Sequence, residues 1–171
     1  MVGYTEVLQT IGAMVIFSLI LLSATRMIQR NTLMQVEGEL EQEVVALAQD
    51  IIEEGRTKEF DEYSVSSALP PADANDFAAP SNLGPDSGEN TRQDFDDFDD
   101  YHDWEEVIET EHGEFNIRTE VFYVNDSFNK TASPTYFKKM QVFITSKFLK
   151  QGSSGEMTEY RLEFTRNYYA D

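Results

Sequence analysis

Apolar and charged residues divide the first third of the chain into two helical segments. Nineteen residues from Val7 to Thr25 carry no charge, and they lie between Glu6 and Arg26. A helix of that length rises about 28 Å, close to the thickness of the hydrocarbon core of a bilayer. We therefore expect residues 1–28 to form a membrane-spanning helix segment. A retained anchor is favoured over a cleaved signal peptide, because no Lys or Arg precedes the run and the helical pattern continues past it.

The helical pattern continues through an amphipathic segment, residues 29–55. Its apolar side chains recur at spacings of three and four residues and form one stripe: Val36, Leu40, Val44, Leu47 and Ile51. Acidic residues occupy much of the remaining surface, and Gly55 is a suitable helix end. The simplest interpretation is one helix from about Tyr4 to Glu54. The alternative is a membrane anchor followed by a separate soluble helix, with a break at Gly38.

The second half of the chain changes from loop composition to a strand pattern. Residues 56–113 form a variable region that is rich in proline from Ser64 to Asn90 and acidic from Asp94 to Glu111. After Gly113, apolar and polar residues alternate with period two in three stretches separated by turn residues. Residues 114–171 are therefore predicted to form an antiparallel sheet of three strands.

A sheet of three strands needs a partner for its apolar face. The amphipathic half of the N-terminal helix is the only long element that the pattern offers. The expected fold class is α+β, with a long N-terminal α-helix, whose first half spans a membrane, packed on a small C-terminal antiparallel β-sheet.

Charge and composition narrow the function classes. The chain has 13 basic and 32 acidic residues, a net charge of −19, which repels the phosphates of nucleic acids. It contains no cysteine, so disulfides and thiolate sites are excluded. It also lacks a glycine-rich phosphate loop and the GxSxG and HExxH motifs. We expect a protein that is not an enzyme and does not bind nucleic acid.

The stretch DFDDFDDYHDW, Asp94 to Trp104, is the strongest candidate for a ligand site. It does not fit an EF-hand, which needs Gly at the sixth position and Glu at the twelfth of its loop. Calcium at another kind of site is one interpretation, with the ligands Asp96, Asp97, Asp99 and Asp100. A solvated acidic surface and a docking surface for a partner are the others. In each of them, four aromatic residues anchor the loop by packing: Phe95, Phe98, Tyr101 and Trp104.

Three motifs together carry a resemblance to a family. GYTEVL, Gly3 to Leu8, lies at the start of the expected membrane helix and contains an early glutamate, Glu6. The strand sequences YVND and YFKKMQVFITS come near the C-terminus, and DDFDDYHDW comes before the sheet. With the expected architecture, this pattern resembles the type IV pilin and type II secretion pseudopilin superfamily, and its minor members in particular.

The resemblance implies a subunit that waits in the inner membrane as a single-pass protein. It is then assembled with other pilin or pseudopilin subunits into an extracellular or periplasmic filament. Glu6 would pair with the N-terminal amine of a neighbouring subunit, and Val7 and Leu8 would belong to the packing surface. Gly3 and Tyr4 mark the family's processing site, although removal of Met1 alone would make Glu6 the fifth residue, as the family pattern requires.

The rival interpretation is a single-pass, membrane-anchored adaptor with an acidic ectodomain. A helix that continues from the membrane into the sheet favours the pilin interpretation. A break near Gly38 or Gly55 would favour the adaptor.

Overall fold

Helix α1 runs without interruption from Tyr4 to Thr57. The structure is a computed structural model that describes residues 3–67, 69–150 and 157–169. The expectation of one continuous helix is confirmed, and the break at Gly38 that the alternative required does not occur; the helix ends at Thr57 rather than at Glu54. Gly55 lies inside the helix, where a Cβ atom would be 2.9 Å from Cε of Met140. This glycine therefore allows a close approach between the helix and the sheet, and it does not end the helix.

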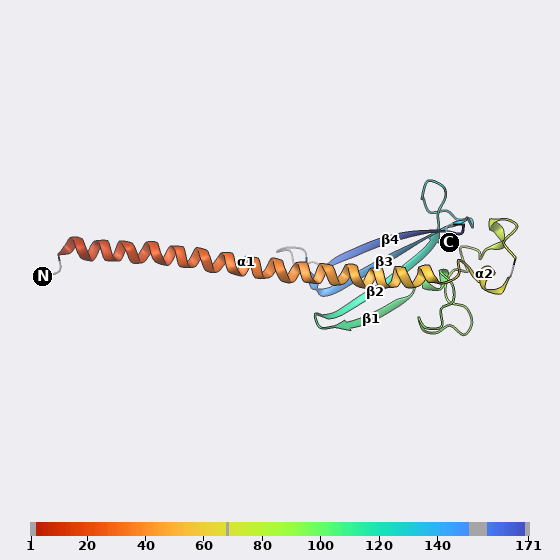
Figure 1. The fold of residues 1–171 in the computed structure, drawn as a ribbon, viewed down its shortest axis with the longest axis horizontal. Coiled ribbons are helices and arrows are strands. Elements are labelled where there is room, and N and C mark those ends of the chain that lie inside the picture. The colour runs from red at the N-terminus through yellow and green to blue at the C-terminus, as the bar shows by residue number, and fades with distance from the viewer. Residues whose placement is uncertain (1–2, 68, 151–156, 170–171) are drawn as a thin grey trace. The chain divides into compact units, whose positions relative to one another are not determined.

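Four strands form the sheet, in the order β1-β2-β3-β4, and all neighbours are antiparallel. They are β1 (Glu105–Thr110), β2 (Gly113–Tyr123), β3 (Phe137–Lys150) and β4 (Met157–Asn167), shown in Figure 1. The expectation of three strands was wrong, because β1 lies in the acidic region that we expected to be loop. A two-residue turn joins it to β2, and Gly113 supports that turn with a positive φ of 118°.

The chain divides into two compact units, Met1–Glu41 and Gln42–Asp171. In the second unit, the last part of α1 lies along one face of the sheet (Figure 1). Its core contains residues of α1, β2 and β3 that are almost fully buried: Val44, Ala48, Ile51, Phe115, Ile117, Val121, Met140, Val142 and Ile144. The α+β fold with a long helix packed on an antiparallel sheet is thus confirmed.

The C-terminal end of α1 is held by an arginine from the last strand. Nη1 of Arg166 donates to the carbonyl oxygens of Gly55, Lys58 and Glu59, at 3.3, 2.6 and 3.0 Å. Gly55 lies in the last turn of α1, where carbonyl oxygens lack their usual helical donor, and Lys58 and Glu59 follow the helix at the negative end of its dipole. A buried cation at this place therefore satisfies the end of α1 and attaches it to β4.

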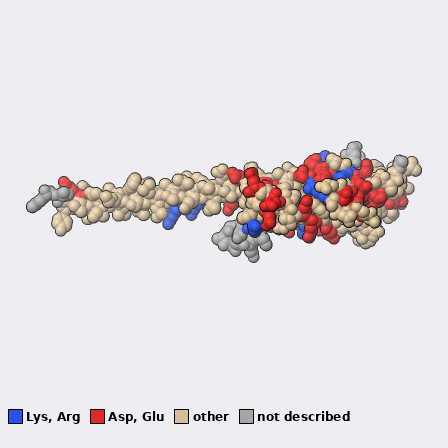
Figure 2. Space-filling view, turned by 90° about the horizontal axis from the view of Figure 1, so that it is seen from below, with Lys and Arg blue, Asp and Glu red and all other residues tan. Residues whose placement is uncertain are grey.

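Short elements connect α1 to the sheet. They are α2 (Glu62–Ser66) and the 3-10 helices Ala74–Asp76 and Asp99–Tyr101. An aromatic cluster lies beyond the end of α1 and is built around Phe60, Phe77 and Tyr123. Asp and Glu side chains gather on the visible surface of the second unit, whereas the first part of α1 is almost entirely uncharged (Figure 2).

Replacing Gly113 with alanine is expected to destabilise the second unit by about 1–3 kcal/mol. Its φ of 118° is unfavourable for any L side chain, and a Cβ atom would overlap the ring of Phe148. The measurement is urea unfolding of the full chain in detergent, followed by the fluorescence of Trp104, the single tryptophan. Gly38→Ala is the control, since a Cβ there meets nothing within 4 Å and the unfolding midpoint should not fall. Equal midpoints for Gly113→Ala and the wild type would contradict the argument.

Candidate functional site

The residues expected to direct assembly lie at the start of α1. Gly3 precedes the helix. Tyr4 is the first residue of the helix and is 97% exposed. Oε2 of Glu6 accepts a hydrogen bond from the backbone N–H of Gly3 at 3.2 Å. The side chains of Val7 and Leu8 are exposed. The carboxylate thus sits in the first turn, where the helix dipole favours negative charge.

The first half of α1 has an apolar surface that is open all around the helix. It is long and apolar enough to cross a membrane. Its large exposed side chains include Ile11, Met14, Val15, Ile16, Phe17, Leu19, Ile20, Leu21 and Leu22. Such a surface is stable only in lipid or against other apolar helices.

A second group of candidate residues surrounds the buried ammonium group of Lys138. This lysine points inward from β3 and is fully buried. Its Nζ donates to Oδ2 of Asp61 at 2.7 Å, to the carbonyl oxygen of Phe60 at 2.8 Å, and to Oδ1 of Asp99. The ring centroid of Phe60 lies 4.7 Å from the same nitrogen. One cation thus joins the sheet, the segment after α1 and the acidic loop.

Asp61 is satisfied on several sides. The backbone N–H groups of Tyr63 and Ala78 donate to it, and the hydroxyl oxygen of Tyr123 lies 3.0 Å from its Oδ2. Burial and the nearby Asp61 raise the pKa of Tyr123, so this phenol remains protonated and able to donate. Such a complete set of donors is what a buried carboxylate requires.

The acidic loop is fixed by its own carboxylates. Oδ1 of Asp97 accepts from the backbone N–H of Asp99 at 2.7 Å and of Asp100 at 3.2 Å. Oδ2 of Asp100 accepts from the backbone N–H of Asp96 at 2.9 Å and of Asp97 at 3.0 Å. Burial, followed by repulsion from Asp99, raises the pKa of Asp97 to about 9, so its carboxyl group is neutral at pH 7. The loop therefore places fewer negative charges beside Lys138 than its sequence indicates.

The four aspartates that we considered as calcium ligands do not form one group. Asp99 is bound to Lys138, and Asp97 is turned toward the backbone of its own loop. Asp96 and Asp100 instead lie with Glu89, and the ligand oxygens of these three residues are within 4.8 Å of one another. Burial, opposed by the backbone N–H groups of Asp97 and Asp96, raises the pKa of Asp100 to about 7. Glu89, Asp96 and Asp100 are the carboxylates that could supply oxygen ligands to a calcium ion.

The four aromatic residues of the loop lie against the second unit. Phe95, Phe98 and Tyr101 are buried, and Trp104 is half-buried. The rings of Phe95, Tyr101 and Trp104 make edge contacts with centroids 5.1 to 6.4 Å apart. The hydroxyl of Tyr101 donates to Glu54 of α1 at 2.7 Å, and Glu54 also forms an ion pair with Arg92. The loop is thus attached to α1 by packing and by charge.

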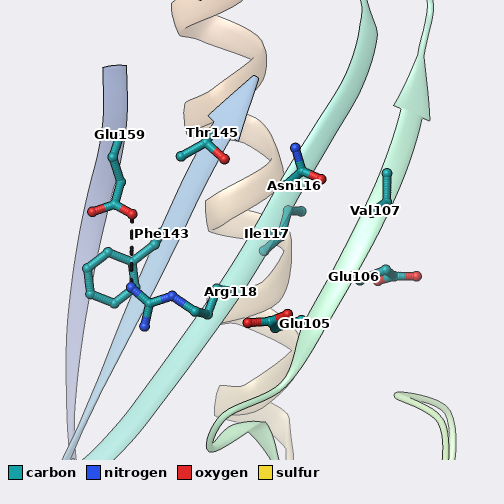
Figure 3. A pocket seen from close by; sticks show the side chains of 9 residues that line it. All are labelled: Glu105, Glu106, Val107, Asn116, Ile117, Arg118, Phe143, Thr145 and Glu159. Carbon is teal, nitrogen blue, oxygen red and sulfur yellow. Dashed lines mark ion pairs between the residues drawn. The ribbon is translucent and has the colours of Figure 1, made fainter. Parts of the chain in front are cut away.

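The outer face of the sheet, away from α1, has an open hollow of about 430 Å³ (Figure 3). Arg118 lies with its guanidinium carbon 4.0 Å from the centroid of Phe143, and it forms an ion pair with Glu159 at 3.9 Å. Glu105, Asn116 and Thr145 line the remaining surface. This arrangement of paired charges is typical of a solvated sheet face.

Three residues of the buried network were not singled out from the sequence: Lys138, Asp61 and Arg166. The signal for Lys138 is its parity, because it shares the alternating face of Met140, Val142 and Ile144. A lysine on an apolar face indicates a buried partner of opposite charge. The partners Asp61 and Asp99 are 77 and 39 residues away, and no local pattern identifies them.

Comparisons with protein-family models, with curated proteins and with solved structures gave no match.

Lys138→Met is expected to destabilise the second unit by about 3–5 kcal/mol, because it leaves Asp61 and Asp99 buried without their cation. The measurement is urea unfolding of the full chain, followed by Trp104 fluorescence. The matched control is Lys139→Met on the outer face, where the ion pair with Glu163 at 3.3 Å contributes less than about 1 kcal/mol. Similar losses for the two variants would show that Lys138 has no special role.

The stability of the second unit is expected to rise as the pH falls from about 9 to 6. Asp97 and Asp100 have raised pKa values, about 9 and 7, in the folded state. In the unfolded chain the same carboxyl groups take up protons only near about pH 4. Between these values the folded state binds more protons than the unfolded state, so lowering the pH stabilises the fold. Asp100→Asn should reduce the slope between pH 6 and 8 by at most about 1.4 kcal/mol per pH unit, the limit for one proton. The exposed Asp126→Asn serves as control and should keep the slope. An unchanged slope in Asp100→Asn would be evidence against this assignment.

Proposed function

We propose that this protein is a structural subunit of a type IV pilus-like or type II secretion filament, of the minor pilin or pseudopilin kind. It assembles through its N-terminal helix and has no catalytic role. Before assembly it resides in the inner membrane as a single-pass protein. Its partners are other subunits of the filament.

The observation that carries the proposal is the continuity of α1. One helix of 54 residues contains an uncharged run long enough to cross a membrane, and its last part packs on the sheet. An adaptor needs only an anchor and a linker, and a helix that continues through Gly38 is not required for that role. A subunit that assembles through its N-terminal helix is expected to have this continuous helix.

Glu6 supports the same proposal by its chemistry. Its carboxylate lies beside the apolar run, and the described structure gives it one hydrogen bond, from Gly3. When the helix enters an apolar bundle, a carboxylate loses its hydration and needs a cationic partner. The N-terminal amine of a neighbouring subunit is such a partner, at the same depth in the bundle.

The alternative, a membrane-anchored adaptor with an acidic ectodomain, is favoured by one observation. The chain divides into two compact units, and the second contains the whole sheet with its own core. The two functions differ in where the protein is found, since an adaptor stays in the membrane and a filament subunit leaves it.

The test is to identify the N-terminus by mass spectrometry in membranes and in material sheared from intact cells. We expect the protein in the sheared fraction, beginning at Val2 or Tyr4. Glu6→Ala should remove it from that fraction and leave its amount in membranes unchanged. Glu53→Ala, which removes an exposed carboxylate paired with Arg56, is the control and should still reach the sheared fraction. Recovery from membranes alone, with an intact N-terminus, would instead support the adaptor.

A further inference from the structure

Lys138, Asp61 and Asp99 bring together an amine and two carboxyl groups that assembly through α1 does not use. Their side chains are 0, 1 and 4% exposed. Lys138 lies on β3, Asp61 precedes α2, and Asp99 begins the 3-10 helix of the acidic loop. The two aspartates are 77 and 39 residues from the lysine in the sequence. The fold thus gathers three reactive groups in one buried place.

The amine of Lys138 contacts both carboxyl groups. Its Nζ donates to Oδ2 of Asp61 at 2.7 Å and to Oδ1 of Asp99. Aromatic rings lie beside the same nitrogen, with the centroids of Phe60 and Tyr123 at 4.7 and 5.2 Å. An amine in contact with a carboxyl group is near the position for attack on the carboxyl carbon. Such placement can correspond to an effective concentration of about 10⁵ M or more.

The two carboxyl groups have different surroundings. The backbone N–H groups of Tyr63 and Ala78 donate to Asp61, and the hydroxyl of Tyr123 donates to its Oδ2. Donors of this kind stabilise an ionised carboxylate, which acts as a base and resists attack by an amine. In the part of the chain that the structure describes, no backbone N–H donates to the carboxyl group of Asp99. Asp61 is therefore suited to move protons, and Asp99 is suited to be attacked.

We propose that the side chains of Lys138 and Asp99 form a covalent amide cross-link, with Asp61 as the acid and base that moves the protons. A bond forms between Nζ of Lys138 and Cγ of Asp99, and one C–O bond of the Asp99 carboxyl group breaks. One water molecule leaves, and the reaction uses no oxidant, reductant or cofactor. The ion pairs of Lys138 described above are the arrangement before this reaction.

The protons balance in three steps. The ammonium group first gives a proton to the carboxylate of Asp99, and burial favours the resulting neutral amine and neutral carboxyl group over two charges. Nζ then attacks Cγ, and Asp61 takes a proton from the nitrogen. Asp61 finally returns this proton to the departing oxygen, which leaves as water. Asp61 is ionised again at the end and is not consumed.

The reaction removes two of the three buried charges. An amide is neutral, whereas a buried ion pair carries the cost of taking two charged groups out of water. Asp61 stays ionised, and its backbone and tyrosine donors remain in place. The bond also joins β3 to the acidic loop across 39 residues of sequence. Like a disulfide, such a cross-link limits the conformations of the unfolded chain.

The test is mass spectrometry of tryptic peptides from the full chain, purified from membranes in detergent. Trypsin does not cleave after a lysine whose amine is bound in an amide, so residues 131–139 should stay in one peptide. We expect this peptide to be joined to residues 93–118, with the summed mass lowered by one water molecule. Separate peptides with cleavage after Lys138 overturn the proposal. A branch to residues 59–92, which contain Asp61, also overturns it.

A loss of water within residues 93–118 alone has a different meaning. An aspartate can lose water by forming a cyclic imide with its own backbone, and that product is not branched. Such a product without the branched peptide contradicts the proposal. Fragmentation of the branched peptide should place the bond between Asp99 and Lys138, and a bond from another aspartate of the loop would contradict the assignment.

Variants assign the roles of the three side chains. Lys138→Arg keeps a positive charge beside both aspartates, but the guanidinium is always protonated and does not attack a carboxyl carbon, so the branched peptide should be absent. Asp61→Asn removes the proton acceptor, and we expect at least about tenfold less branched peptide at the same time after synthesis. Lys139→Arg is the matched control. It changes the neighbouring lysine on the outer face, paired with Glu163 at 3.3 Å, and should keep the full amount.

Trp104 fluorescence should show that each variant is folded. Equal amounts of branched peptide in folded Asp61→Asn and in the wild type would contradict the role of Asp61. If a variant fails to fold, the wild-type peptides still decide whether the bond exists. The test concerns the second unit alone and needs neither assembly nor shearing, so its result is independent of the proposed filament.

Discussion

The buried ammonium group of Lys138 is the interaction on which the arrangement of the second unit depends. It brings together three segments that are far apart in the sequence: the residues after α1, the acidic loop and the middle of the sheet. A buried cation has no adequate replacement for water except carboxylates and carbonyls at hydrogen-bond distance. The loop and the end of the helix are therefore held in one position, because only that position satisfies the lysine.

This network shows that several aspartates of the acidic loop have a structural role. In the sequence, Asp96 to Asp100 have the appearance of a ligand site. In the structure, two of these carboxylates bind backbone N–H groups of their own turn, and a third binds Lys138. These carboxyl groups thus stabilise the loop itself. Among the residues that the structure describes, Glu89, Asp96 and Asp100 form the group that could hold a cation, and Glu89 lies outside the acidic stretch.

The elements that could be predicted from the sequence are those with strong periodicity. They are the uncharged run, the apolar stripe of the helix and the alternation in β2, β3 and β4. Each of these patterns extends over enough residues to indicate a helix or a strand. Strand β1 was missed because its glutamates resemble the loop before it, and only Ile108 and Thr110 are partly covered. Lys138, Asp61 and Arg166 were missed for another reason: their partners are distant in the chain, and long-range pairing leaves no local signal.

The cap that Arg166 places on α1 has a consequence for the order in which the molecule is made. Gly55, in the last turn of α1, is synthesised more than one hundred residues before the arginine that donates to its carbonyl oxygen. The apolar run can therefore enter a membrane while the sheet does not yet exist, since synthesis proceeds from the N-terminus and each part folds when it is complete. Until β4 emerges, the end of α1 remains solvated and β3 lacks its outer neighbour. Insertion of the helix and closure of the sheet are thus two events separated in time, and the last of them awaits residue 166.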